Sequence, residues 1–181
     1  MKETQDKYDF RVRWQPFLLR PDLPEEGVPK PPDKMIVPRP LPHFVTQGKQ
    51  FGIDFTFKCP RYPNTIRSHA LLEFAKDKGD FDKQNEISEK IFQSYFTNGV
   101  FLDTDALVSI AKEVGYEPDE VKEFINRSQV QENVLKQYKT WSSKGVSGVP
   151  HFFMNGYSTF SGAQDPRSFI KMFERVAELQ S

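Results

Sequence analysis

A length of 181 residues fits one domain, or one domain with a sizeable insertion, and 25 Lys and Arg residues balance 25 Asp and Glu residues. This balance leaves no electrostatic footprint for nucleic acid or an anionic membrane surface. A single cysteine excludes an intrachain disulfide framework and a cysteine-rich zinc site. The charged first residues and the lack of a long apolar run argue against a signal peptide and a transmembrane helix, so we expect a cytoplasmic domain without a bound metal.

The first predicted element is a strand. Residues 9–19 alternate the apolar side chains Phe10, Val12 and Trp14 with polar ones, which is the pattern of a strand with one buried face. The alternation stops at Pro16, and an aromatic and aliphatic patch follows. We therefore expect one half-buried strand over this range.

The next segment, residues 20–62, is rich in proline. Eight prolines lie between Pro21 and Pro42. Because proline fixes φ and has no N–H donor, regular structure is disfavoured and we expect an extended loop packed over the surface. A short strand-like run at residues 53–58 closes the segment.

Residues 63–144 predict an all-helical insertion. Apolar side chains recur at helical spacing, with Asn64 as the first N-cap and glycines at the helix ends. The last of these segments is either one long helix or two abutting helices. The predicted helical segments are residues 64–79, 82–99, 103–115 and 117–145.

The C-terminal stretch GVSGVPHFFMNGYSTFSGAQDP predicts two short strands joined by a tight turn at Asn155-Gly156. Val149-Pro150 precedes the first strand, although proline cannot donate to a sheet and is confined to strand starts, edges and bulges. Asp165-Pro166 reads as the N-cap and first residue of a helix over residues 165–179.

Four stretches in register resemble the DsbA-like thioredoxin-fold oxidoreductases, in particular their FrnE-type branch. They are VRWQPFLLRPDLPEEG, PNTIRSHALLEFA, SYFTNGVFLDTDALVSIAKEVG and the C-terminal GVSGVPHFFMNGYSTFSGAQDPRSFIKMF. The resemblance covers nearly all of the chain. It implies an α/β, thioredoxin-like (DsbA-like) fold in one domain, residues 1–181, in which residues 145–181 form a cis-proline hairpin and a C-terminal helix around the all-helical insertion.

The resemblance gives Val149 and Pro150 a role in substrate binding. In the family, the proline that matches Pro150 follows a cis peptide bond and faces the active-site dithiol. Such a kink would leave the backbone N–H and C=O of Val149 free to pair with an extended peptide. The spacing alone favours a proline that merely starts an edge strand, because only about 5–6% of X-Pro bonds are cis.

The family's dithiol is missing from this sequence. The family begins with a strand and a helix whose N-terminus carries C-x-x-C. This sequence starts almost at the family's second strand, which only residues 1–7 precede, and neither C-x-x-C nor C-x-x-S occurs. We therefore expect an N-terminally truncated member without catalytic residues. The lone Cys59 is expected to be a small buried hydrophobe, and it cannot cycle a dithiol by itself.

Three functions remain open. The first is a member of the thiol–disulfide oxidoreductase family without redox activity in this chain, and the second is a non-catalytic module that binds a thiol- or disulfide-containing peptide. The third is a glutathione-dependent transferase or isomerase, since kappa-class glutathione transferases and 2-hydroxychromene-2-carboxylate isomerases are relatives that bind the glutathione carboxylate at a similar turn. Gln164 and Asp165 match that turn with one extra residue.

The missing first strand also has a structural consequence. In a thioredoxin-like sheet it lies between the strand at residues 9–19 and the proline-led strand. Without it, both strands would present unpaired edges, which invite association. We therefore expect a homo-oligomer formed through open sheet edges, or partial folding in which the helical insertion keeps most of its order.

Overall fold

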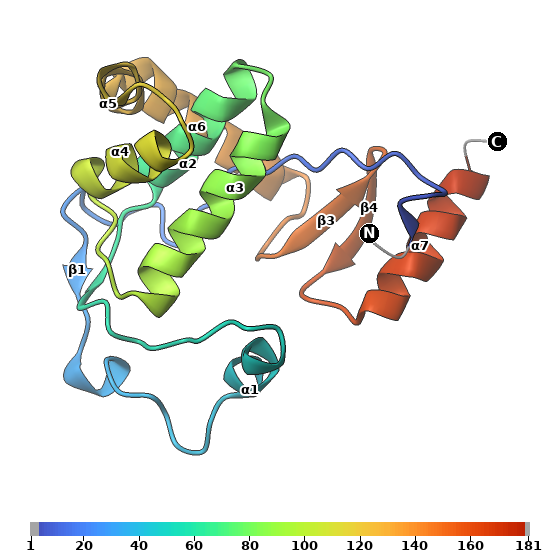
Figure 1. Cartoon of the computed structure of the whole chain (residues 1–181), viewed down its shortest axis with the longest axis horizontal. Coiled ribbons are helices and arrows are strands. Elements are labelled where there is room, and N and C mark those ends of the chain that lie inside the picture. The colour runs from blue at the N-terminus through green and yellow to red at the C-terminus, as the bar shows by residue number, and fades with distance from the viewer. Residues whose placement is uncertain (1–3, 180–181) are drawn as a thin grey trace.

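A computed structural model describes residues 4–179 and shows two parts along the long axis of the molecule (Figure 1). The larger part is the helical insertion expected over residues 63–144. Helix α3 (Phe81–Phe92) continues into one π-helical turn, η3 (Gln93–Thr97). Arg127 separates the last two helices of this part, so the segment predicted over residues 117–145 is two abutting helices. The helices are α2 (Ile66–Asp77), α3 (Phe81–Phe92), α4 (Thr104–Glu113), α5 (Pro118–Asn126) and α6 (Ser128–Ser143).

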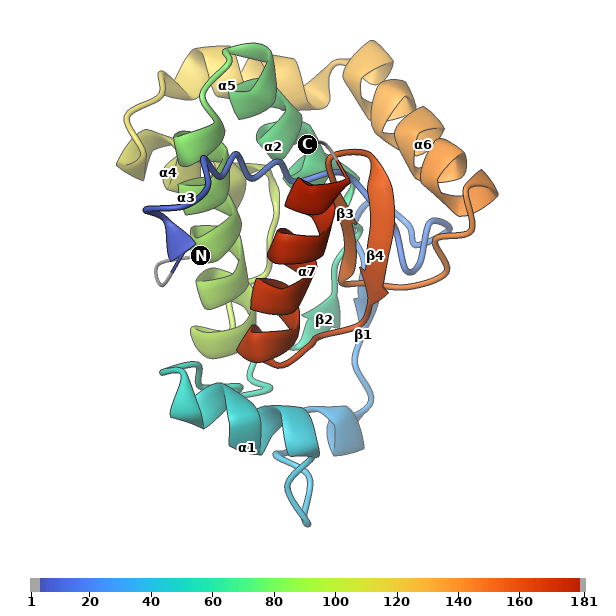
Figure 2. The same cartoon turned by 90° about the vertical axis from the view of Figure 1, so that its right-hand side faces the viewer.

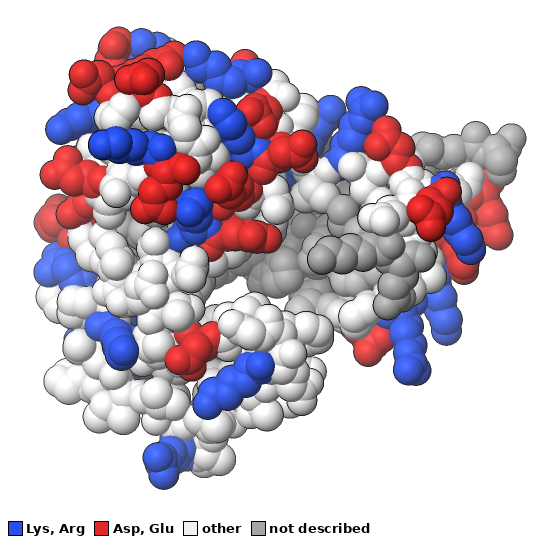
Figure 3. Space-filling model, viewed as in Figure 1, with Lys and Arg blue, Asp and Glu red and all other residues white. Residues whose placement is uncertain are grey.

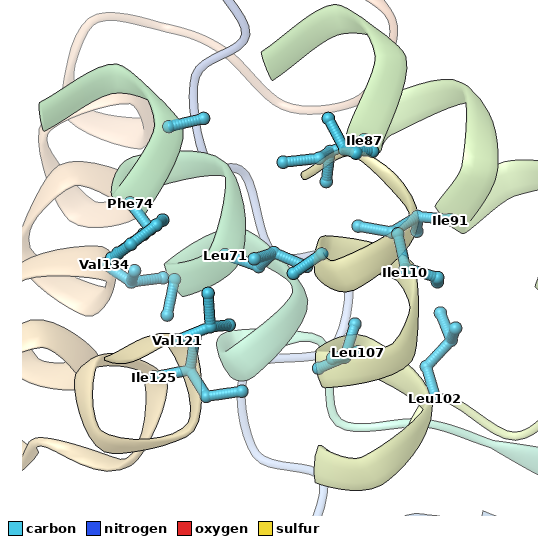
Figure 4. Close-up of a cluster of buried hydrophobic side chains, with 14 residues drawn as sticks. Leu71, Phe74, Ile87, Ile91, Leu102, Leu107, Ile110, Val121, Ile125 and Val134 are labelled. Atoms are coloured by element: carbon cyan, nitrogen blue, oxygen red, sulfur yellow. The ribbon is translucent and has the colours of Figure 1, made fainter. Parts of the chain in front are cut away.

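The hydrophobic core lies within these helices (Figure 4). Leu71 and Phe74 of α2 are at its centre, and Ile87, Leu107 and Ile125 reach them from α3, α4 and α5. Each of these side chains is almost fully removed from water, which stabilises the fold by about 1.5–3 kcal/mol per side chain. The periodic apolar positions of the sequence thus become one contiguous core.

Short polar side chains set the starts of the helices. The carboxylates of Asp80 and Asp103 accept hydrogen bonds from the N–H groups of Lys83 and Ala106, at 3.0 and 2.9 Å. Asn64 was expected as the N-cap of α2, but the N-cap is Thr65, so the helix begins one residue later than expected. The side chain of Asn64 still accepts a hydrogen bond from the N–H of Ile66 at 3.0 Å.

The smaller part is a hairpin covered by a helix. Strands β3 (His151–Met154) and β4 (Tyr157–Ser161) pair antiparallel, and α7 (Pro166–Glu178) packs on one face. The Asn155-Gly156 turn has positive φ at both residues, as a tight two-residue hairpin requires. Aromatic rings join helix and sheet, because Phe169 lies 4.9 Å from Phe152 and 5.1 Å from Phe160 between ring centroids.

The predicted strand at residues 9–19 is wrong, because the segment is extended but pairs with no strand among the described residues. Its backbone is paired by a side chain instead. The N–H of Trp14 donates to Oε1 of Gln84 at 2.9 Å, and Nε2 of Gln84 donates to the carbonyl of Trp14 at 3.1 Å. One buried amide therefore takes the place of a neighbouring strand.

The prediction of an irregular loop over residues 20–62 is only partly right. Strands β1 (Val28–Pro29) and β2 (Arg61–Tyr62) form a two-residue ladder, and a 3-10 turn η2 (Pro32–Lys34) follows β1. Helix α1 (His43–Gln50) starts directly after Pro42. The strand-like run at residues 53–58 forms no strand. Its aromatic side chains pack against α1 instead, which brings ring centroids of Phe44 and Phe55 to 5.2 Å.

The pairing of Trp14 leads to a stability prediction for Gln84→Leu. Leucine keeps the volume but leaves both backbone groups of Trp14 without a partner, and an unpaired buried polar group costs about 1–3 kcal/mol. We expect urea denaturation, followed by tryptophan fluorescence, to show a loss of unfolding free energy of about 2–4 kcal/mol. The control Asn85→Ala removes only the hydrogen bond to the Trp14 indole and should cost about 1 kcal/mol or less. Equal effects of the two variants would contradict this role for Gln84.

A second anchor of the same segment gives stability a pH dependence. Nε2 of His69 in α2 lies 3.1 Å from the carbonyl of Phe17, and burial lowers the pKa of His69 from 6.5 to about 4, although the bond to Phe17 opposes the shift. Between pH 6.5 and 4 the unfolded chain therefore binds more protons than the folded one, so stability falls as the pH falls through this window.

We expect the free energy of unfolding at pH 4.5 to lie about 1–3 kcal/mol below its value at pH 7, because a pKa difference of one between the folded and unfolded chains corresponds to roughly 1.4 kcal/mol. His69→Gln keeps a donor for the Phe17 carbonyl but does not titrate, so its profile should be flatter. Denaturant titrations of both proteins across this range provide the measurement. Parallel profiles would assign the acid sensitivity to other groups.

Candidate functional site

The candidate site is the loop that leads from α6 into β3. Its Val149–Pro150 peptide bond is cis, and the Val149 residue is 50% exposed. The carbonyl of Pro150 accepts a hydrogen bond from the N–H of Gly162 at 2.8 Å, which ties the entrance of the hairpin to its exit. No residue of the described chain hydrogen-bonds to the backbone N–H or C=O of Val149. Two strong backbone groups are therefore available beside a fixed loop.

A short polar and aromatic wall continues from this loop along β3. His151 places Nε2 at 3.0 Å from Oγ of Ser158, and its Nδ1 is buried without a partner in the described structure. The ring of Phe153 lies 5.0 Å from His151 and 5.1 Å from Trp141 of α6. No motif in the sequence marks these residues as a site. The alternation of positions 149, 151 and 153 along one strand is the signal that could have found them.

The other two predicted binding residues, Gln164 and Asp165, have local structural roles. One carboxylate oxygen of Asp165 accepts from the N–H of Arg167 at 2.8 Å and caps α7. Nε2 of Gln164 approaches the carbonyl of Gly162 at 3.4 Å. Gln164 thus lies next to the hydrogen bond that joins Gly162 to Pro150, whereas Asp165 is already engaged by its own helix.

The only cysteine lies elsewhere. Cys59 is 1% exposed, and its Sγ lies 3.4 Å from the carbonyl of Arg61 beside β2, which Figure 1 places with β1 away from the hairpin. Burial raises the pKa of Tyr95 and lowers the pKa of Lys30. The structure does not bring this thiol to the Val149–Pro150 loop.

The face of the molecule that Figure 3 shows carries charges of both signs. Acidic and basic side chains alternate over the helices that Figure 3 shows, without a large area of one sign. Between residues 4 and 179, no group of His, Cys, Asp and Glu could hold a metal ion. Within the same residues, no helix is both long and apolar enough to span a bilayer.

Comparisons with known proteins agree on the fold. A family model described as DSBA-like thioredoxin domain matches residues 1–173. Among solved structures, a probable DsbA oxidoreductase from Streptomyces coelicolor superposes with a TM-score of 0.73 at 20% identity, covering 88% of this chain and 72% of that one. A search of curated proteins gives no significant match. The structural likeness, at this identity, concerns the fold alone.

Proposed function

This chain belongs to the DSBA-like thioredoxin domain family, and from that premise we propose that it binds peptides on the family's fold without carrying out dithiol exchange itself. One observation carries the proposal: its single cysteine is buried, while the exposed loop at Val149 offers free backbone groups. We also propose that it belongs to the FrnE-type branch, on the strength of the four stretches described above.

The chemistry of exchange explains the redox part of the proposal. A thiolate must attack one sulfur of a disulfide, releasing the other as a thiolate, and a second thiol must then resolve the mixed disulfide. Cys59 has no second thiol in the sequence, and a disulfide cannot reach its buried sulfur without local opening. A single buried thiol supports neither the first step nor the second.

The binding part rests on Val149 and Pro150. An extended peptide can pair its own N–H and C=O groups with those of Val149, as in strand addition. The hydrogen bond from Gly162 to Pro150 holds the loop in place, so little order has to be gained on binding. We propose a thiol- or disulfide-containing peptide as the partner, because the resemblance to the family implies substrates of that kind.

Glutathione binding is the alternative that the geometry favours least. It would need Gln164 and Asp165 to receive the glutathione carboxylate. The Asp165 side chain carries the same sign of charge and already accepts from the N–H of Arg167. Isothermal titration with reduced glutathione, compared with Gln164→Ala, would detect such a site.

We predict that the purified chain does not accelerate the reduction of insulin by dithiothreitol above the uncatalysed rate. The physical reason is the missing resolving thiol, so Cys59→Ser should behave like the unaltered chain. The measurement is the turbidity of precipitating insulin, with a thioredoxin that contains C-x-x-C as the positive control. Turnover that depends on Cys59 would contradict the proposal.

A further inference from the structure

The loop between η2 and α1 projects from the rest of the molecule. In Figure 1 it forms the lowest point of the chain, and Figure 2 shows it beyond α1 from a second side. Every residue from 31 to 41 is exposed. No backbone hydrogen bond of the described chain involves residues 36–41. The loop is therefore open to a partner over its whole length.

This loop carries several exposed apolar side chains. Ile36 is 66% exposed and Leu41 is 44% exposed, and Met35 and Val37 are exposed as well. A single exposed aliphatic residue is normal on a protein surface, but four within seven residues form a patch. The lower part of the surface in Figure 3, which holds this loop, carries few charges. Apolar patches of this kind mark sites of interaction.

The prolines make this patch stiff. Val37, Arg39 and Leu41 each precede a proline, whose ring restricts the backbone of the residue before it to extended conformations. Pro42 has φ −57° and ψ 144°, in the polyproline II region. The chain bends at residues 39 and 40, which are joined by a cis peptide bond. Because each proline also fixes its own φ, little conformational freedom remains to be lost when a partner binds.

The charge of the loop narrows the kind of partner. Arg39 lies between two X-Pro pairs, Val37-Pro38 and Leu41-Pro42, and forms no ion pair with the carboxylates that the structure describes. Nζ of Lys34 already lies 3.5 Å from a carboxylate oxygen of Asp33. An anionic membrane is recognised by clusters of about four to eight basic residues, so this loop fits one poorly. A single carboxylate beside an apolar groove complements it better.

We propose that residues 35–42 form a docking site for a separate protein domain whose groove is lined by aromatic rings and carries a carboxylate at its rim. The two X-Pro pairs pack on the aromatic rings, as proline-rich segments do in domains that recognise them, and Ile36 extends this apolar contact. Arg39 donates to the carboxylate. The docking site is distinct from the loop at Val149, so it does not depend on the peptide binding proposed above.

The test is isothermal titration of the full chain with a panel of purified proline-recognising domains of the WW and Src-homology types. We expect at least one domain to bind with a dissociation constant of about 0.1 mM or tighter. Ile36→Glu, which places a charge in the patch, should weaken that binding at least tenfold. The matched control Leu19→Glu alters a residue outside the loop that is 68% exposed, and should change binding less than twofold. Arg39→Gln should weaken binding about threefold, as expected for the loss of an exposed ion pair.

Each contrary result overturns the inference. Failure of every domain to bind would exclude the proposed partner, and equal effects of Ile36→Glu and Leu19→Glu would exclude the loop. Co-sedimentation with vesicles of phosphatidylserine and phosphatidylcholine that Ile36→Glu abolishes, while no domain binds, would make a membrane the occupant. A dimer in sedimentation velocity that Ile36→Glu dissociates would make a second copy the occupant. Circular dichroism checks the fold of each variant, and Leu41→Glu replaces Ile36→Glu if the latter does not fold.

Discussion

The pairing of Trp14 with the Gln84 side chain is the constraint on which the arrangement of the molecule depends. A backbone N–H and C=O removed from water must find partners, and strands usually supply them. Here one amide, 0% exposed, accepts from the N–H of Trp14, donates to its carbonyl and also donates to the carbonyl of Leu72 at 3.1 Å. The amide thereby fixes the N-terminal segment against both α2 and α3.

From that point the segment connects the two parts of the molecule. Toward the helices, the ring of Phe17 packs at 5.3 Å from Tyr138 of α6, and its carbonyl meets His69. Toward the hairpin, Phe10 lies 4.8 Å from Phe173 of α7. Aromatic pairs of this kind contribute about 0.5–1.5 kcal/mol each beyond their buried area. The orientation of the candidate site relative to the helical core thus depends on contacts of an extended segment.

The sequence predicts those elements whose stability is local. Helical periodicity and capping residues place the helices of the insertion within a few residues, and the Asn155-Gly156 turn places the hairpin. The strand at residues 9–19 could not be judged in this way, because alternation describes a segment with one buried face but says nothing about its partner. Helix α1 was missed since the prolines dominate its surroundings and its own sequence includes Gly48, whose missing side chain admits the ring of Phe55. The cis bond between Val149 and Pro150, expected from the family resemblance, is present, whereas substrate binding at this loop stays a prediction. The local roles of Gln164 and Asp165 depend on contacts at the end of β4.

The position of Pro150 now has a physical reason. Its carbonyl pairs with Gly162 of the exit, so its missing N–H belongs to the side that faces β4. The carbonyl of Gly162, which would normally accept from the residue opposite it, is approached instead by the Gln164 amide. The N–H that Pro150 lacks would therefore have pointed toward β4. On the opposite side of the strand, the backbone N–H and C=O groups of Val149, His151 and Phe153 are all present. A residue that cannot donate is tolerated at this strand because the edge that remains open does not need it.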